Sequence, residues 1–470
     1  MNAVAEPLVA SEPPPAAAIL PQVARTTRKR SMLELARRLR TDLTVLYEND
    51  RFYREDVIVR RSLLTNFIIA MKPDLIRHVM VTNASNYQRG TMTKNTVRAW
   101  AGDGILTSEG EAWRSARRIL EPWFHRRTLD QFTEPTIAAT RSALDGIEDA
   151  VEDGRPISVE EFCTSLTTRI IAQSLFSCDI DARMDDLHAE LTEIQEEMTK
   201  IKLSDLLGFG RFLPKRYNAR TRATLRNLKA IFDPIIEQRR TSGEKRPDFL
   251  QSMLDAGNKP DGTPRLTEQQ IYDNVFSVFL GAPESTGYAL VWTIYLLSRF
   301  PDVQEKVFAE ADEILGSENF CSDDLAKMTY SWCVMQEAMR LYPPVHSFTR
   351  EAIGDDQFGD VKIPRGSTIF FPVYAIHRHE KLWDQPDAFN PERFRHGARA
   401  GKDDLFSFLA FSTGPRFCVG RPFAEMELKL IIGMLVRRYR IKPAGEGPVG
   451  LKGLVTLRPA SRIEVRLEPR

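Results

Sequence analysis

Ten residues near the C-terminus constrain the fold more than any other part of the chain. They run Phe411-Ser-Thr-Gly-Pro-Arg-Phe-Cys418-Val-Gly420 and directly precede a helical apolar pattern over about 421–439. Glycines allow the backbone to turn tightly and to approach a flat cofactor. The helix that follows would place its N-terminal dipole and free N–H groups near the sulfur and stabilise a thiolate. The segment therefore predicts a thiolate presented to a metal; the alternative is a buried structural cysteine in a glycine turn.

This segment resembles the haem-binding loop of the cytochrome P450 superfamily, Phe-x-x-Gly-x-Arg-x-Cys-x-Gly. Its five defining positions match at Phe411, Gly414, Arg416, Cys418 and Gly420. The resemblance implies a haem b cofactor (iron protoporphyrin IX) with Cys418 as the axial thiolate ligand of the metal. Arg416 would neutralise a carboxylate beside the site.

Three more residues match cofactor-binding positions of that family. Trp113-x-x-x-Arg117 places two large donors one helical turn apart, and the resemblance implies that both face a haem propionate. Arg350, ten residues after Arg340, matches another propionate-binding arginine. The alternative for the first pair is a half-buried tryptophan beside a surface arginine.

Glu337 and Arg340 are three residues apart on a predicted helix, so their side chains can meet. In the family, such a pair joins a second arginine downstream in a buried triad. The matching segment here is Pro-Glu-Arg-Phe at 391–394, which makes Arg393 the third member. The resemblance implies a structural triad that holds the haem loop in place.

A long helix is predicted over about 267–297, beginning at a capping box, Thr267-x-x-Gln270. Within it, Gly-Ala-Pro-Glu-Ser-Thr at 281–286 resembles the family's oxygen-activation segment. The resemblance implies a catalytic proton relay through Glu284 and Ser285. Serine replaces the usual threonine, and Thr286 could substitute only if the proline kink rotates it inward.

Helical patterns dominate the chain, with short strand patterns at 57–60, 66–71, 367–372 and 463–467. We expect a mainly α fold with a minor β portion (α+β), the cytochrome P450 fold in one large domain over 26–470. Residues 1–25 form a Pro/Ala-rich extension that we expect to be disordered. The basic stretch 25–40 has a helical apolar face, which suits a solvated first helix or a membrane-surface helix.

Composition excludes several classes of protein. The formal net charge of the 470 residues is +1, which gives no electrostatic reason to expect nucleic acid as a partner. The 5 cysteines are scattered, which is typical of a reducing compartment and not of a disulfide framework. No window is long and apolar enough to predict a transmembrane segment. We expect a cytoplasmic protein, and a monomer.

The substrate pocket is predicted from family topology, which also assigns to it the segments 87–106 and 203–213. The expected pocket is largely apolar and suggests a lipophilic substrate such as a fatty acid, terpenoid or polyketide. His346 is its polar exception, and could orient a substrate or bond to backbone. The expected lining residues are Phe276, Phe279, Leu280, Gly281, Val345, His346, Leu454 and Val455.

These features together predict a haem-thiolate monooxygenase that hydroxylates or epoxidises a small molecule. The sequence ends soon after the cysteine loop and has no ferredoxin-like cysteine cluster. We therefore expect electrons from NAD(P)H through a separate ferredoxin or flavodoxin and its reductase. The alternatives are a peroxide-driven or rearrangement/coupling haem-thiolate enzyme, and a non-catalytic haem-binding module.

Overall fold

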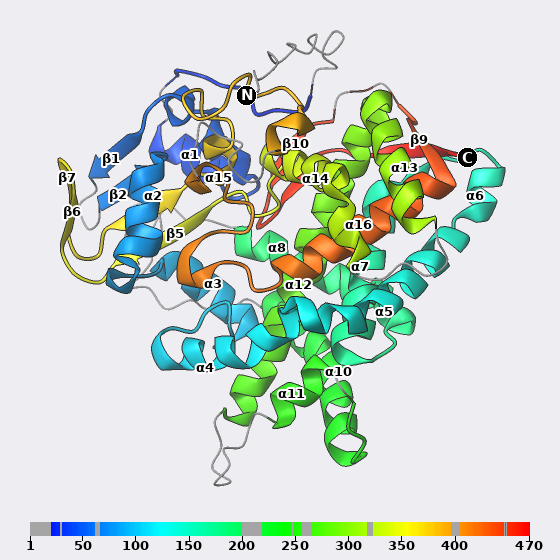
Figure 1. The fold of residues 1–470 in the computed structure, drawn as a ribbon. Coiled ribbons are helices and arrows are strands. Elements are labelled where there is room, and N and C mark those ends of the chain that lie inside the picture. Colours follow the sequence, from blue (N-terminus) through cyan, green and yellow to red (C-terminus); the bar gives the residue numbers. More distant parts are fainter. Residues whose placement is uncertain are drawn as a thin grey trace, which may run out of the picture.

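The computed structural model describes residues 20–28, 31–61, 66–199, 219–246, 248–255, 266–316, 323–395, 405–445, 447 and 449–470. Figure 1 shows the largest group of strands at one side of the molecule and helices filling most of the rest. The mainly α fold with a minor β portion is confirmed. None of the described helices is both long enough and apolar enough to cross a membrane.

The helices occupy most of the described chain. Their bounds are α1 (Met32–Arg38), α2 (Pro73–Arg77), α3 (Thr91–Ala101), α4 (Gly110–Leu120), α5 (Arg126–Asp145), α6 (Glu148–Glu152), α7 (Val159–Phe176), α8 (Met184–Thr199), α10 (Ala219–Thr241), α11 (Phe249–Asp255), α12 (Glu268–Arg299), α13 (Pro301–Leu315), α14 (Thr329–Leu341), α15 (Val373–Ile376) and α16 (Arg421–Arg438).

The strands form one larger sheet and three smaller ones. Their bounds are β1 (Val57–Arg61), β2 (Asn66–Ala70), β3 (Tyr87–Arg89), β4 (Ile157–Ser158), β5 (Phe348–Ala352), β6 (Asp356–Phe358), β7 (Val361–Ile363), β8 (Thr368–Phe371), β9 (Tyr439–Pro443), β10 (Leu451–Gly453), β11 (Leu457–Pro459) and β12 (Glu464–Pro469). The larger sheet has the order β1-β2-β8-β5-β3, in which β2 and β8 are parallel and the other pairs antiparallel. The smaller sheets are β4-β12-β9 and the pairs β10-β11 and β6-β7.

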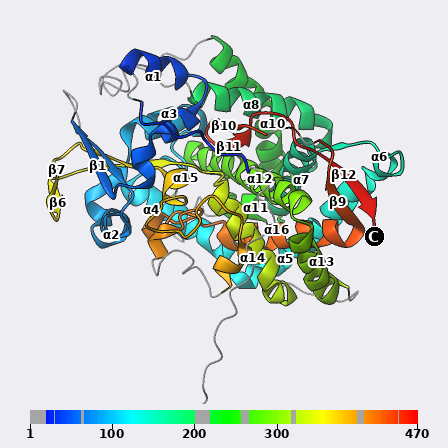
Figure 2. The same ribbon diagram turned by 90° about the horizontal axis from the view of Figure 1, so that it is seen from above.

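Helix α12 runs through the middle of the molecule and carries much of the core (Figure 2). It begins at the predicted capping box, where the Thr267 side chain accepts the Gln270 N–H at 3.2 Å and the Gln270 side chain accepts the Thr267 N–H at 2.9 Å. It packs against α7, α14 and α16. Pro283 interrupts its backbone bonding, and Thr167 of α7 donates to the Pro283 carbonyl at 2.8 Å.

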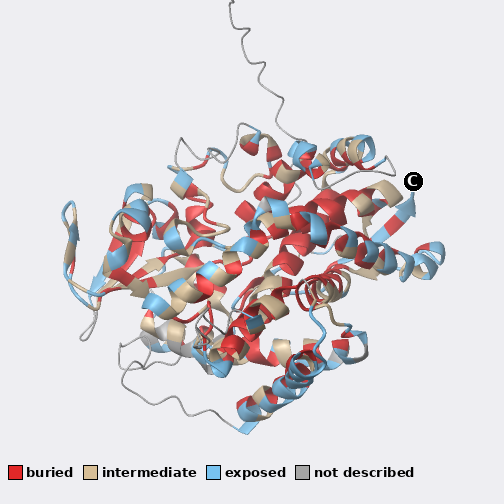
Figure 3. Cartoon of the chain, turned by 60° about the horizontal axis from the view of Figure 1, so that its bottom comes forward, coloured by how far each residue is buried: buried red, intermediate tan, exposed pale blue. Residues whose placement is uncertain are grey.

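Helix α16 is buried along most of its length, and its buried residues include the charged side chains of Glu427 and Lys429. It packs against α5, α12, α13 and α14, so it is fixed on several sides. Figure 3 shows buried residues concentrated along such central helices. Because α16 starts at Arg421, directly after the cysteine segment, the core fixes the position of that segment.

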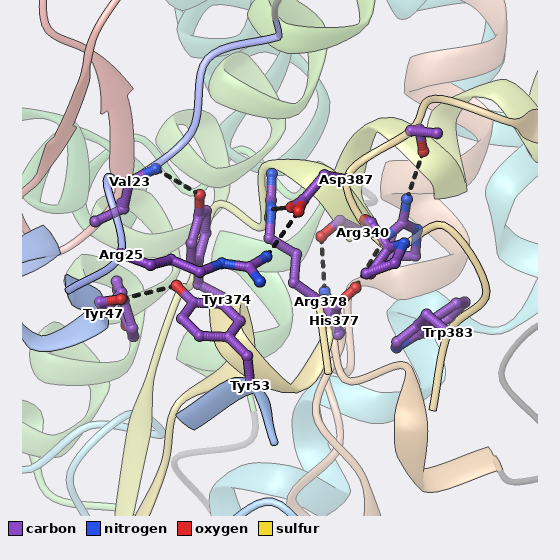
Figure 4. Close-up of polar contacts among 12 residues, drawn as sticks. Val23, Arg25, Tyr47, Tyr53, Arg340, Tyr374, His377, Arg378, Trp383 and Asp387 are labelled. Atoms are coloured by element: carbon purple, nitrogen blue, oxygen red, sulfur yellow. Dashed lines mark hydrogen bonds and ion pairs between the residues drawn. The ribbon is translucent and has the colours of Figure 1, made fainter. Parts of the chain in front are cut away.

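Residues 20–25, which fall within the expected disordered extension 1–25, contact the rest of the protein. Val23 is 9% exposed and its N–H donates to the Tyr374 hydroxyl at 3.1 Å. The Arg25 guanidinium stacks 4.0 Å from the Tyr53 ring centroid and forms ion pairs with Glu380 and Asp387 (Figure 4). These contacts tie the segment to α15 and the chain after it. Residues 1–19 lie outside the described part of the chain.

Candidate functional site

The cysteine segment is a closed loop with a strict steric requirement for one glycine. The Cys418 N–H donates to the Phe411 carbonyl at 2.9 Å, and the Phe417 N–H donates to the Gly414 carbonyl at 3.0 Å. Gly414 has a φ of +71°, and a Cβ there would lie 1.9 Å from the Met80 carbonyl oxygen. A side chain at position 414 would therefore force this loop away from its support.

The Cys418 sulfur lies at the N-terminus of α16. Its side chain is accessible to solvent although protein atoms surround it, so it faces an internal space and not the outer surface. Burial raises the pKa of Cys418, while the N–H groups of Gly420 and Arg421 and the charge of Arg117 lower it. These donors favour the thiolate, and that is the state a metal ligand requires.

Arg117 of α4 supports the loop directly. Its Nη1 donates to the Phe417 carbonyl at 2.8 Å, and its guanidinium lies 4.4 Å from the Phe417 ring centroid. Its Nη2 is buried without a hydrogen bond in the described chain, with the Glu121 carboxylate 3.5 Å away. Arg117 therefore braces the residue before the ligand and keeps one buried donor for a further acceptor.

A second group of residues lies beside the loop, where Arg416 meets α4. Arg416 Nη1 donates to the Ser108 carbonyl at 3.1 Å, and Nη2 forms an ion pair with Glu109. Its guanidinium stacks 4.3 Å from the Trp113 ring centroid. Glu109 also accepts the N–H of Arg89 at 3.0 Å. Two of the predicted cofactor-binding residues, Arg416 and Trp113, are thus brought together, with Arg89 as a neighbour that the sequence pattern had not indicated.

Arg89 and Arg350 are paired in register on β3 and β5. Burial lowers the pKa of Arg89 to about 9, and the charges of Arg350 and Arg416 lower it further. Burial also lowers the pKa of Arg350 to about 10, with Arg416 again contributing. The Arg89 Nε is buried and has no hydrogen-bond partner in the described residues. Three cations therefore lie close to one carboxylate, that of Glu109.

This excess of buried positive charge is unfavourable unless further anions join it. Haem b has two propionates, and its iron takes a thiolate ligand, so the residues present fit this cofactor. Cys418 would ligate the iron, and Arg89, Arg350 and Arg416 would hold propionates beside Trp113. Nothing in the local sequence of Arg89 distinguishes it, because its role depends on the pairing of β3 with β5.

The predicted triad forms. Arg340 donates to both oxygens of Glu337, from Nε at 2.7 Å and from Nη2 at 2.8 Å. Arg393 Nε donates to Glu337 at 3.2 Å, and the Asn390 N–H donates to it at 2.8 Å. Glu337 and Arg340 are fully buried, so this is a desolvated charge cluster and not a surface pair.

The triad reaches the cysteine segment through His377, which sequence reasoning missed. Arg340 donates to the carbonyls of His377, Pro386 and Ala388 at 2.6–2.9 Å (Figure 4). The His377 Nε2 accepts the Leu409 N–H at 2.7 Å, two residues before Phe411. Burial lowers the pKa of His377 to about 3, so its ring is neutral and Nε2 can accept.

Glu284, the acid of the oxygen-activation segment, is held by two residues of the β10-β11 hairpin. Glu284 Oε1 pairs with Arg458 Nη2 at 2.6 Å and with the Thr456 hydroxyl at 2.6 Å. The Ser285 hydroxyl donates to the Gly281 carbonyl at 2.9 Å, in the turn of α12 that contains Pro283. Thr286 is buried and lies near Glu427 of α16. The two hydroxyls that the sequence left as alternatives therefore face different neighbours.

Several residues expected to line the substrate pocket are buried against other side chains. Phe276 and Phe279 are buried and pack edge-on against Phe232 of α10. His346 is 1% exposed; its Nδ1 contacts the Tyr47 hydroxyl at 2.6 Å and its Nε2 contacts the Leu454 carbonyl at 2.8 Å. Both ring nitrogens are engaged, so of the two roles expected for His346 the structure shows the contact with backbone.

The remaining predicted pocket residues divide by exposure. Val345 and Val455 are 42% and 36% exposed between buried neighbours, and Leu280 and Gly281 are partly exposed. Leu454 is buried, and its carbonyl contacts the His346 ring. The predicted segment 203–213 lies outside the described residues.

Comparisons with known proteins show which sequences and folds this chain resembles. The family model described as Cytochrome P450 matches residues 44–466. The chain is 30% identical over 376 residues to cyclooctat-9-en-7-ol 5-monooxygenase of Streptomyces melanosporofaciens, covering 80% of each protein. It is 28% identical to pentalenene oxygenase of Streptomyces avermitilis, covering 88% of this chain and 90% of that protein. A crystal structure of a cytochrome P450 (CYP102L1) superposes with a TM-score of 0.77 at 22% identity, covering 93% of this chain and 94% of that one.

Proposed function

Because the chain belongs to the cytochrome P450 family, we propose that it hydroxylates or epoxidises a lipophilic small molecule at a haem held by Cys418. Membership makes it a haem-binding monooxygenase. The observation that carries the proposal is the accessible Cys418 sulfur at the start of α16. Beside it lie three arginines, Arg89, Arg350 and Arg416, with one carboxylate, that of Glu109. Bound haem would supply the activation of dioxygen.

The reaction consumes one dioxygen, two electrons and two protons, and it yields the oxygenated product and water. We propose that the electrons come from NAD(P)H through a ferredoxin or flavodoxin and its reductase. The chain's own task is to hold the cofactor, to shape an apolar pocket and to move protons. Glu284 and Ser285 are the residues we assign to proton delivery on the side of α12 that carries Gly281.

For the substrate we propose a compact, apolar molecule of the terpenoid class. Two relatives are named for oxygenation of cyclooctat-9-en-7-ol and pentalenene. The exposed valines at 345 and 455 and the partly exposed Leu280 are apolar, which suits such a molecule. A fatty acid or a polyketide would also meet apolar walls, and is therefore part of the test.

The first experiment establishes the ligand. Reduced protein under carbon monoxide should show the strongly red-shifted Soret band of a thiolate-bound haem, and Cys418→Ala should lose it. Retention of the band by that variant would overturn the assignment. Cys163→Ala is the matched control, because Cys163 is a buried cysteine of α7 and should leave the band unchanged.

The second experiment separates the reaction types. Binding spectra are recorded with cyclic terpene hydrocarbons and alcohols, fatty acids and polyketide lactones. Each binder is then incubated with NAD(P)H, ferredoxin and reductase, or with hydrogen peroxide alone. We expect product only with the electron donors. Product with peroxide alone would favour the peroxide-driven alternative, and no product in either case would favour a non-catalytic haem protein.

A further inference from the structure

The segment 102–107, between α3 and α4, is tied to α12 by a buried carboxylate that no part of the proposed function uses. This carboxylate belongs to Asp273 of α12, which is 5% exposed. Its Oδ2 accepts the Asp103 N–H at 2.7 Å, and its Oδ1 accepts a hydrogen bond from Gln269 Nε2 at 2.7 Å. Burying a carboxylate is costly unless it is hydrogen-bonded. Asp273 and the segment therefore stabilise each other.

Two glycines allow the segment to lie directly on α12. Gly102 has a φ of +55°, and a Cβ there would lie 2.2 Å from the Asp273 carboxyl carbon. A Cβ at Gly104 would lie 2.2 Å from the Asp273 carbonyl oxygen. Because a side chain does not fit at such distances, glycine at both positions lets the backbone reach Asp273. The contact thus requires an acid on α12 and glycines on the segment.

The segment is also closed on itself by hydrogen bonds. The Thr107 hydroxyl donates to the Gly102 carbonyl at 2.5 Å. The N–H groups of Thr107 and Ser108 donate to the Gly104 carbonyl at 3.0 and 2.9 Å. A turn with these internal bonds moves as one unit, so the contact with Asp273 sets the position of all its residues.

This unit carries Leu106 to the part of α12 that contains Gly281. A Cβ built at Gly281 would lie 3.7 Å from Leu106 Cδ1, which is an ordinary van der Waals distance, so the two residues are neighbours. Both are partly exposed, whereas Ile105 and Thr107 on either side of Leu106 are buried. The Gly281 carbonyl accepts the Ser285 hydroxyl. Leu106 therefore limits the space for a ligand beside the oxygen-activation segment.

The other end of the segment has its own support. The Ser108 carbonyl accepts Arg416 Nη1 at 3.1 Å, and Glu109 forms an ion pair with Arg416. Loss of the Asp273 contact should therefore free residues 102–107 and leave the residues that would hold the propionates in place. The effect of Asp273 on the pocket can thus be measured apart from cofactor binding.

We propose that Asp273 is a positioning residue that determines which substrates fit. It fixes the segment 102–107 so that Leu106 closes the space over Gly281, and ligands too wide for that space are excluded. Without the carboxylate, the segment moves away from α12 and Leu106 moves with it, so the pocket accepts wider molecules. This inference rests on the proposed monooxygenase function, because it assigns a size limit to the pocket of that enzyme.

The first measurement needs no ligand. Amide hydrogen exchange is followed by mass spectrometry in peptides that cover residues 102–107. We expect exchange there to be at least about tenfold faster in Asp273→Ala. Asp273→Asn should give an intermediate rate, because its amide oxygen can still accept the Asp103 N–H. Glu268→Gln, an exposed residue of the same helix, is the matched control and should change nothing. Unchanged exchange in Asp273→Ala would overturn the proposal.

The second measurement uses two probes of different width, imidazole and 4-phenylimidazole. Each binds a haem iron through a ring nitrogen and shifts the Soret band, so the ratio of their dissociation constants reports the room in the pocket without a known substrate. We expect the ratio to change in favour of the phenyl compound by at least about fivefold in Asp273→Ala and in Leu106→Ala. Gly281→Ala should change it in the opposite direction.

The double variant Asp273→Ala/Leu106→Ala shows whether Asp273 acts through Leu106. We expect it to change the ratio no more than the larger single variant does, because both changes remove one contact. Two effects that simply multiply would overturn the proposal. So would a lower melting temperature of Asp273→Ala with an unchanged ratio, since that would show a structural role only.

These outcomes are separate from the proposed function. The carbon monoxide spectrum of the unmodified protein tests whether a thiolate-bound haem is present, and the Asp273 variants leave Cys418 intact. If that spectrum is absent, the proposed function fails, and the size limit that rests on it fails as well. If the spectrum is present and Asp273→Ala keeps the ratio of the unmodified protein, only the role of Asp273 is excluded.

Discussion

The Nε2 atom of His377 accepts the backbone N–H of Leu409 at 2.7 Å, and this bond connects the buried Glu337–Arg340 pair with the loop that carries Cys418. The other ring nitrogen faces the Arg340 carbonyl at 3.2 Å. A neutral imidazole with its proton on Nδ1 satisfies both contacts at once. The triad thus contacts the cysteine loop indirectly, through His377, whose two ring nitrogens each contact a backbone group.

His377→Leu should loosen this connection. The change leaves the Leu409 N–H and the Arg340 carbonyl without partners, and we expect a loss of about 1–3 kcal/mol in the free energy of unfolding. Haem should also dissociate faster, measured by transfer to apomyoglobin. His379→Leu is the control, since His379 is a buried residue whose ring contacts the Glu55 carbonyl and the Lys381 N–H, neither of which belongs to the loop. It should lower stability while leaving haem retention unchanged; equal haem loss in both variants would contradict the connection.

Arg340→Met should destabilise the protein more than Arg393→Met. Arg340 makes two bonds to the Glu337 carboxylate and three to carbonyls, whereas Arg393 makes one bond to the carboxylate. We expect a loss of about 3–5 kcal/mol for Arg340→Met, because it leaves a buried charge largely uncompensated. For Arg393→Met we expect about 1–3 kcal/mol. Urea denaturation of both variants checks the order, and the reverse order would contradict this description.

Arg89→Met should raise the stability of the haem-free protein and lower its affinity for haem. Burial and two neighbouring guanidinium groups lower the pKa of Arg89 to about 9, so its charge opposes folding at pH 7. Removing that charge should raise the melting temperature of haem-free protein. The same change removes a partner for a propionate, so haem affinity should fall.

Arg114→Met is the control for that experiment, because Arg114 is an exposed residue of α4 paired with Glu111. It should affect neither quantity measurably. If Arg89→Met instead lowered the melting temperature of the haem-free protein, the three cations would not be repelling one another as we infer.

The contribution of Glu427 to the free energy of unfolding should fall as the pH rises from about 5 to 8. The unfolded carboxyl releases its proton near 4.5, whereas burial raises the pKa of the folded carboxyl to about 8. Between these values the folded state binds more protons, so raising the pH favours unfolding. The effect amounts to about 5 kcal/mol at most.

The difference between the unmodified protein and Glu427→Gln isolates this contribution, because the buried histidines and other titrating groups are common to both. Denaturation at intervals between pH 5 and pH 9 should show the two curves separating as the pH rises, with the variant the more stable at pH 8. Parallel curves would mean that Glu427 titrates normally.

Much of the fold was predictable because its signals are local. The strand at Val57–Arg61, the capping box at Thr267 and the helix that Pro301 begins follow from patterns within a few residues of each position. The Cys418 segment was predictable for the same reason, since glycines, an arginine and a following helix are contiguous. The triad could be predicted because its members match a spaced motif.

Other features depend on contacts between distant parts of the chain. The ordered segment around Val23 depends on Tyr374, a residue 351 positions away, and a Pro/Ala-rich composition gave no sign of it. Phe276 and Phe279 are apolar residues of a helix, and apolar character alone does not distinguish a core contact from a pocket wall. The positions of Phe232 on α10 and Phe176 on α7 show which side chains they pack against.

The sequence by itself indicated the proposed metal ligand, the brace around Glu337 and the helical framework, because each depends on residue types at short, fixed spacings. The tertiary structure decided the electrostatics. It alone brought Arg89 beside Arg350 and Arg416, paired Glu284 with Arg458, and left Glu427 buried without a cation. The pKa of a group depends on burial and on charges a few ångströms away, and these distances arise only when the chain has folded.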